Sequence, residues 1–268
     1  MKLHFVAVLV LWAAIGYGQE TSSPFELKKS TDIVLLSTAI GSSIAGYALI
    51  QNIEPLTPYE VGTLDASNIW APDRVATRLY SQPARLLSDI GLASALSMSL
   101  VFLSNNTPKQ EYSKLLVIGA ETALYTVGLT LLTKGFTKRA RPFVYNSIAD
   151  LSHKTDKDAR QSFFSGHTSI ASAACFFVAQ SAAQYSFSTS HKRLIWTSAA
   201  IVPAFVGTMR VLGGKHFPSD VITGYAIGAV LGCGIPYLHQ RRPSSFSFYP
   251  GFNSLHLSYT LQSKKKPF

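Results

Sequence analysis

The sequence predicts an all-α protein: a bundle of about six apolar helices embedded in a membrane, with a short β-like tail at the C-terminus. Only 14% of its 268 residues are charged, against about a quarter in soluble domains. The charges are also missing in blocks, each long enough to form a helix. The uncharged stretches cover 33–53, 90–108, 122–133, 168–190, 194–209 and 221–238.

Local signals place the ends of these helices. Asn105-Asn106-Thr107-Pro108 stops the second helix, Ser165 is a good N-cap for the fourth, and Pro218 suits the first position of the sixth. A long polar loop over 135–164 separates the third helix from the fourth, and loops of that length are usually functional. We expect helices over about 33–53, 85–104, 112–134, 166–187, 193–211 and 218–239.

The chain divides into an N-terminal segment, a group of N-terminal helices, a core and a tail. Residues 1–18 have the layout of a secretory signal peptide, with Lys2 ahead of an apolar run. A retained N-terminal apolar segment is the alternative. Residues 19–111 hold the N-terminal helices and a connecting segment, and residues 112–239 form the core.

The tail, 240–268, changes character. Its polar and apolar residues alternate, which predicts a small hairpin around Pro250-Gly251. Cys175 and Cys233 both lie within apolar helices, so we expect two free thiols and no disulfide framework.

The net charge of +10 is compatible with a nucleic acid, an anionic membrane surface or an anionic substrate. No nucleic-acid-binding motif is present, and the basic residues gather at helix ends instead of along one face. We therefore expect no nucleic acid partner.

The first of three charged clusters holds Lys134, Arg141 and Pro142. Arginine presents a planar fork that suits two phosphate oxygens, and lysine adds a mobile charge. Lys138 and Arg139 are expected to point elsewhere. The alternative is a stop-transfer cluster of basic residues at the edge of a membrane, which would have the same sequence pattern.

The second cluster, Ser165-Gly166-His167, stands where the fourth helix begins. The first amides of a helix bind anions, glycine lets the backbone approach a ligand, and an imidazole can donate a proton to a leaving group. An ordinary N-cap beside an interfacial histidine is the alternative.

The third cluster holds Arg210, His216 and Asp220 around a Gly-Gly turn. A carboxylate four residues after a histidine can accept its ring N–H, which leaves the other nitrogen free to attack. A capping aspartate beside a surface histidine is again the alternative.

The combined spacing, Lys-x6-Arg-Pro, Ser-Gly-His and Arg-x5-His-x3-Asp, resembles the type 2 phosphatidic acid phosphatase (PAP2) and vanadium haloperoxidase superfamily. The resemblance covers about 112–239. Phe164 stands where the family usually has proline, and Met209 where it usually has serine.

The resemblance implies a role for each motif residue. His216 would attack phosphorus to give a phosphohistidine, oriented by Asp220, and His167 would protonate the leaving alkoxide and later activate water. The phosphate oxygens would be bound by Lys134, Arg141, Ser165, Gly166 and Arg210.

No cofactor or metal is implied. Asp150, His153, Asp156 and Asp158 lack the spacing of metal ligands, so we expect a solvated loop there. Glu121 lies within a predicted helix about 20 Å from Lys134, so we expect a structural partner across helices.

The resemblance therefore predicts a metal-independent phosphatase that acts on a phosphomonoester or diphosphate, most simply one carried by a lipid. Phosphatidic acid, phosphatidylglycerol phosphate, undecaprenyl diphosphate and lipid A phosphate are candidates. A vanadate-dependent haloperoxidase and a non-catalytic membrane protein that binds anionic lipid are the alternatives.

With six spans, basic loops on the side opposite the clusters would be cytoplasmic by the positive-inside rule. The site would then face the periplasmic or extracellular side of the cell envelope. A cleaved signal peptide followed by six full spans would reverse this orientation, and the sequence leaves the two open.

Overall fold

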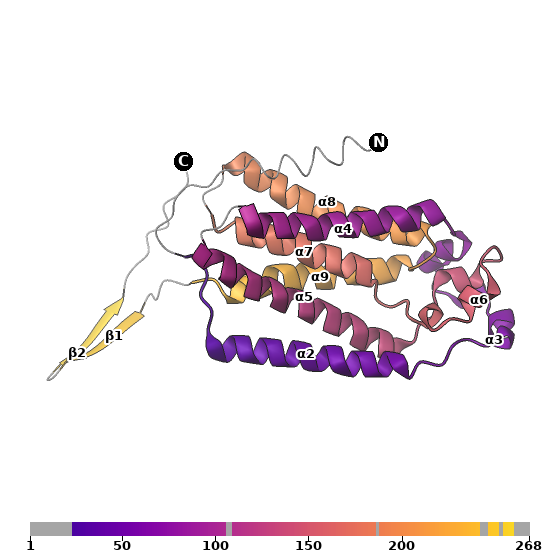
Figure 1. The fold of residues 1–268 in the computed structure, drawn as a ribbon, viewed down its shortest axis with the longest axis horizontal. Coiled ribbons are helices and arrows are strands. Elements are labelled where there is room, and N and C mark those ends of the chain that lie inside the picture. The colour runs from indigo at the N-terminus through magenta and orange to yellow at the C-terminus, as the bar shows by residue number, and fades with distance from the viewer. Residues whose placement is uncertain (1–22, 106–108, 186–187, 242–245, 252–253, 260–268) are drawn as a thin grey trace.

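The computed structural model describes residues 23–105, 109–185, 188–241, 246–251 and 254–259. The predicted signal segment, 1–18, lies outside the described residues. Six long helices run alongside one another (Figure 1), which confirms the predicted helical bundle. They are α2 (Lys29–Gln51), α4 (Gln82–Asn105), α5 (Lys109–Thr137), α7 (Gly166–Ala182), α8 (Thr189–Leu212) and α9 (Pro218–Leu238).

The helix bounds follow the sequence signals to within four residues, except at the end of α7. The end of α7 falls at Ala182, five residues before the predicted end. Tyr185 explains this: the chain turns there, its ring enters the core, and its centroid lies 6.4 Å from that of Phe25.

Helix α7 packs against α4, α5, α8 and α9 and forms the centre of the bundle. Its contact with α9 is close because both surfaces carry small residues. A Cβ placed on Gly228 of α9 would lie 2.2 Å from the carbonyl oxygen of Ser169, so only glycine fits there.

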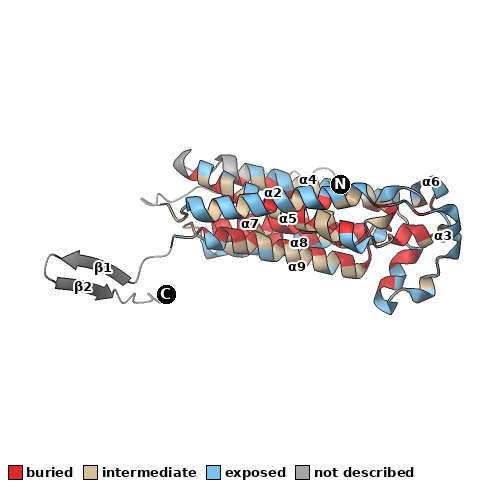
Figure 2. Ribbon diagram, turned by 90° about the horizontal axis from the view of Figure 1, so that it is seen from below, coloured by how far each residue is buried: buried red, intermediate tan, exposed pale blue. Residues whose placement is uncertain are grey.

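The outer surface of the bundle is apolar. Figure 2 shows α2 largely exposed along its length, and only 11% of the residues in its apolar 18-residue stretch are buried. Large exposed apolar patches are typical of proteins that meet lipid or a partner. Within the described ranges, four helical segments are long and apolar enough to cross a membrane: Lys29–Gln51, Glu111–Tyr145, Thr189–Leu212 and Pro218–Leu238. These helices indicate that the protein is embedded in a membrane.

Short helices cap one end of the bundle (Figure 1). Between α2 and α4 lie α3 (Pro58–Thr63), η1 (Ala66–Asn68) and η2 (Ala71–Arg78). The predicted 135–164 loop contains η3 (Pro142–Tyr145), α6 (Leu151–Lys154) and η4 (Lys157–Arg160). The two segments share a small core of Leu56, Phe143, Val144, Ala149 and Ala159.

The tail contains a two-stranded antiparallel hairpin, as the alternation predicted. Strand β1 (Phe246–Gly251) pairs with β2 (Ser254–Tyr259), with Phe246 opposite Tyr259 and Gly251 opposite Ser254. Both cysteines are free, as expected.

Candidate active site at the capped end of the bundle

The three sequence clusters meet at the capped end because α5 and α8 end there and α7 and α9 begin there. Lys134 lies in the last turn of α5 and Arg210 in the last turn of α8, while His167 and Asp220 lie in the first turns of α7 and α9. The convergence buries charge. Lys134, Arg141, Ser165, Arg210, His216 and Asp220 are all buried.

A glycine turn and a proline shape the approach to the site. Gly214 has a positive φ of 67°, which lets the chain reverse between α8 and α9, and its carbonyl accepts the Phe143 N–H at 2.9 Å. Arg141, just before Pro142, is extended (φ −79°, ψ 155°), as expected for a residue that precedes proline. The turn and the 135–164 loop are thereby joined.

His216 has a defined tautomer. Its Nδ1 lies 2.7 Å from the carbonyl oxygen of Ser162, and its Nε2 lies 3.0 Å from Nη1 of Arg141. A carbonyl only accepts and a guanidinium only donates. The proton therefore sits on Nδ1, and Nε2 presents a lone pair toward the site.

The electrostatic surroundings keep this ring neutral. Burial lowers the pKa of His216 well below its ordinary value, and the charges of Arg141, Lys134 and Arg210 lower it further. A neutral imidazole whose Nε2 lone pair lies beside Arg141, amid three cations, can attack an electrophile that carries negative charge.

Arg141 is fixed by the loop. Its Nε donates to the Asp158 carbonyl at 2.7 Å, and its Nη2 lies 2.6 Å from Asp158 Oδ1. Lys215 Nζ lies 3.3 Å from the other oxygen of that carboxylate. Burial raises the pKa of Asp158, but the charges of Arg141 and Lys215 outweigh it and hold the pKa below its ordinary value. Asp150, His153 and Asp156 are exposed, as expected for a solvated loop, whereas Asp158 is half-buried and pairs with Arg141 and Lys215.

His167 and Arg210 share a carboxylate from α4. His167 Nε2 lies 2.9 Å from Asp89 Oδ1, and Arg210 Nη1 lies 3.5 Å from the same oxygen. Burial lowers the pKa of His167 to about 4, Arg210 contributes in the same direction, and Asp89 opposes both. The buried Nε of Arg210 has no hydrogen-bond acceptor among the described residues. It is a donor available to an anion.

Asp89 carried a signal that sequence reasoning passed over. It is the only acidic residue of α4. It stands directly before the uncharged run 90–108, and its carboxylate is more than half exposed.

Ser165 caps α7, as predicted. Its hydroxyl accepts the Thr168 N–H at 3.4 Å and bonds the Thr168 hydroxyl at 2.8 Å. Gly166 lies against α5, where a Cβ would be 3.2 Å from Thr130 Cγ2 and 3.9 Å from Lys134 Cε. The first amides of α7 are therefore next to the Lys134 side chain, whose Nζ donates to the Gln161 carbonyl at 2.7 Å.

Asp220 is held by several donors. Its Oδ2 accepts from the Ser162 hydroxyl at 2.5 Å and the Phe217 N–H at 2.9 Å, and it lies 3.7 Å from His216 Nδ1. Arg139 Nη1 lies 2.5 Å from Oδ1, and Arg139 Nη2 lies 2.8 Å from Asp73. The direct acceptor of the His216 N–H is thus the Ser162 carbonyl. Asp220 acts on His216 through its hydrogen bond to the Ser162 hydroxyl.

The expectation that Arg139 points away was wrong. Helix α5 ends at Thr137, and Lys138 adopts a positive φ of 45°, which turns the next side chain inward over Phe217. Lys138 itself is exposed, as expected. The sequence patterns gave no sign of Asp73 or of this turn.

Comparisons with known proteins agree with the motif resemblance. The PAP2 superfamily model matches residues 114–244. Phosphatidylglycerophosphatase B of Bacillus subtilis (strain 168) is 30% identical over 118 residues, which cover 44% of this chain and 52% of that protein. The chain therefore matches about half the length of this relative.

A solved structure is also similar: the transmembrane PAP2 type phosphatidylglycerolphosphate phosphatase from Bacillus subtilis. It is 19% identical, with a TM-score of 0.38, over 77% of this chain and 94% of that one. The family match, in contrast, spans all three clusters from Lys134 to Asp220. Residues 114–244 of this chain, which hold all three motif clusters, are thus similar to the PAP2 superfamily.

Proposed function

We propose that the chain is a metal-independent phosphatase of the cell envelope that hydrolyses a phosphomonoester or diphosphate of a lipid through a phosphohistidine intermediate. The observation that carries the proposal is His216: a neutral imidazole whose tautomer is fixed by the Ser162 carbonyl and whose Nε2 faces Arg141. That geometry suits attack on phosphorus.

The cations bind the phosphoryl group in this proposal. Lys134, Arg141 and Arg210 hold its oxygens, and the Nε–H of Arg210, which has no acceptor within the described part of the chain, provides a ready donor. The Gly166 amide and the Ser165 hydroxyl, at the N-terminus of α7, complete the set. Positioning and charge stabilisation provide most of the catalysis in phosphoryl transfer.

The reaction has two steps. In the first, His216 Nε2 attacks phosphorus, the P–O bond to the leaving group breaks, and His167 donates a proton to the departing alkoxide. In the second, His167 takes a proton from water, the hydroxide attacks phosphorus, and the P–N bond breaks to release phosphate. The Ser162 carbonyl and Asp220 stabilise the Nδ1–H while the ring is positively charged.

An apolar pocket supports a lipid as substrate. It has a volume of about 360 Å³ and lies among α4, α5 and α7, with Leu96, Leu100, Leu116, Ile170 and Phe177 in its lining. Thr126, also in the lining, is two helical turns before Lys134, and Ile170 is one turn after His167. An acyl or isoprenoid chain in this pocket would have its phosphate near the cations. The name of the Bacillus relative, a phosphatidylglycerophosphatase, suggests a glycerophospholipid phosphate.

The test is phosphate release by the purified protein in detergent, with EDTA present and no added metal. The panel contains phosphatidylglycerol phosphate, phosphatidic acid, undecaprenyl diphosphate, lipid A and soluble phosphate esters. We expect release from at least one lipid. Turnover of soluble esters alone would refute the lipid substrate. Vanadate-dependent halide oxidation without any phosphate release would refute the phosphatase and favour a haloperoxidase.

We also propose that the capped end faces the periplasmic or extracellular side. Basic residues at the opposite end of the helices, such as Lys114, Lys192 and Arg193, support this under the positive-inside rule. The exposed Ser152→Cys and Ser190→Cys variants mark the two ends. A membrane-impermeant maleimide added to intact cells should label Cys only at position 152, and labelling only at position 190 would reverse the orientation.

A further inference from the structure

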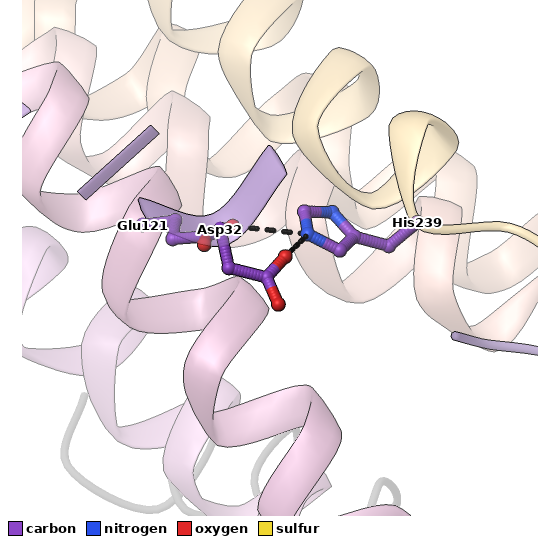
Figure 3. Close-up of side chains that lie close together, drawn as sticks. All are labelled: Asp32, Glu121 and His239. Atoms are coloured by element: carbon purple, nitrogen blue, oxygen red, sulfur yellow. Dashed lines mark hydrogen bonds and ion pairs between the residues drawn. The ribbon is translucent and has the colours of Figure 1, made fainter. Parts of the chain in front are cut away.

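A second group of polar side chains meets away from the capped end. Asp32 lies in the first turn of α2, Glu121 within α5, and His239 at the C-cap of α9. One potential ligand atom from each lies within 4.8 Å of the other two. Figure 3 shows the three side chains pointing toward one another from three helices. Glu121 is thirteen residues before Lys134 on α5, a separation of about 20 Å from the active site.

His239 presents a ring nitrogen to the two carboxylates. Its Nδ1 lies 2.9 Å from the Ile235 carbonyl, which can only accept, so Nδ1 carries a proton. Its Nε2 lies 3.0 Å from Asp32 Oδ1 and 3.3 Å from Glu121 Oε2. A neutral ring in this tautomer would direct a lone pair at two anions. Positive charge between the three groups removes that repulsion.

Glu121 needs the same positive charge. Its side chain is fully buried, and neither carboxylate oxygen accepts a hydrogen bond from the described residues. A buried carboxylate without donors is costly. A protonated His239 would compensate one of the two carboxylates, whereas a divalent cation would compensate both.

We propose that Asp32, Glu121 and His239 bind a divalent transition metal ion of the zinc type. Imidazole with two carboxylates suits zinc, whereas calcium and magnesium prefer oxygen ligands alone. Tetrahedral zinc with bonds of about 2.0–2.1 Å separates its ligand atoms by about 3.3 Å. The two separations from His239 Nε2, 3.0 and 3.3 Å, are close to that value.

The second ring nitrogen of His239 supports the assignment. Metal-binding histidines almost always donate their other N–H to a carboxylate, a backbone carbonyl or water, which orients the ring. The Nδ1 contact with Ile235 provides this bond. Because the three ligands come from α2, α5 and α9, the ion would join the peripheral helix α2 to the core and act on stability.

The test uses the purified full-length protein, dialysed against a weak chelator and titrated with zinc chloride against a chromogenic chelator. We expect one bound zinc per chain by elemental analysis and a zinc-dependent rise in Tm of several degrees. Glu121→Gln and Asp32→Asn should each weaken zinc binding at least tenfold and remove the Tm rise. Two substitutions guard against failure of either variant to fold.

Glu54→Gln is the matched control, since Glu54 is exposed and lies outside the cluster. His216→Asn is a second control: a loss of zinc binding in this variant would show that zinc is held at the active site instead. Equal zinc binding by the native protein and both cluster variants would overturn the proposal. Absence of zinc binding by the native protein would also overturn it, and the cluster would then be an imidazolium between two carboxylates.

Discussion

Arg139 Nη1 lies 2.5 Å from Asp220 Oδ1, so the carboxylate four residues after His216 is bound by an arginine from the end of α5. The same guanidinium contacts Asp73 through Nη2 at 2.8 Å. This arginine joins α9 to the short helices at the capped end, and it holds Asp220, whose Oδ2 lies 3.7 Å from His216 Nδ1. We expect it to act as a positioning residue.

Arg139→Gln should therefore reduce kcat without a comparable change in KM. Loss of the guanidinium leaves the buried Asp220 with fewer donors. Asp220 and Ser162, which orient the His216 ring, should then shift. We expect a fall in kcat of about 10- to 100-fold, as for small misplacements of reacting groups. The loss of stability should be about 3 kcal/mol, because breaking a buried pair leaves an uncompensated charge.

Two further variants make that result specific. The adjacent Lys138→Gln, at an exposed side chain, should leave kcat and Tm unchanged. Arg139→Lys should recover part of the stability, since it restores charge but loses the fork that spans Asp73 and Asp220. A variant at Arg139 with native kcat would show that Asp220 is oriented without it.

Asp89→Asn should move the basic limb of the kcat profile to lower pH. In the proposed mechanism His167 must be protonated to serve the leaving group, and Asp89 raises the pKa of His167 against burial and Arg210. Removal of the carboxylate lowers that pKa, so the protonated form is lost at a lower pH. The expected displacement is about one pH unit.

The measurement is kcat against pH from 4 to 9 for the native protein and the variant. In the complex, the negative phosphoryl group raises the pKa of His167 above its value of about 4 in the free protein. The acidic limb of kcat/KM belongs to His216, which must be neutral to attack, and it should lie well below pH 6.5 because burial and the charges of Arg141, Lys134 and Arg210 lower the pKa of His216 in the free protein. An unchanged basic limb in Asp89→Asn would contradict the role given to His167.

Arg210→Lys should weaken binding of inorganic phosphate, measured as competitive inhibition, by about tenfold. Lysine keeps the charge but loses the Nε–H that has no acceptor among the described residues. A hydrogen bond between charged groups contributes about 1.5–3 kcal/mol. An unchanged inhibition constant would mean that the phosphate does not lie beside Arg210 Nε.

The fold followed closely from the sequence, because blocks of uncharged residues bounded by Ser165, Pro218 and similar signals determine helices locally. The motif residues also converged as expected, since their positions at alternating helix ends bring them to one end of the bundle. In contrast, the partners of those residues depended on tertiary structure. Asp73 lies in a polar connecting segment without any pattern, and Arg139 turned inward only because Lys138 reverses the chain.

Three acidic residues show which contacts of the site could be predicted from the sequence and which could not. Asp158 contacts Arg141 because the 135–164 loop packs as a cap with its own small core, which periodicity does not reveal. Asp89 could have been identified, since a lone acid in an apolar helix needs a partner. Glu121 followed that same reasoning, and His239, at the end of α9, lies 3.3 Å from its carboxylate.

The central claim is that His216 forms a covalent bond to phosphorus, and rapid quenching with a ³²P-labelled lipid substrate tests it most directly. We predict a labelled protein that is stable in base and labile in acid, with the label on the peptide that contains His216. His216→Ala should abolish both the label and phosphate release. Full phosphate release by the native protein with no trapped label, together with turnover by His216→Ala, would contradict the account.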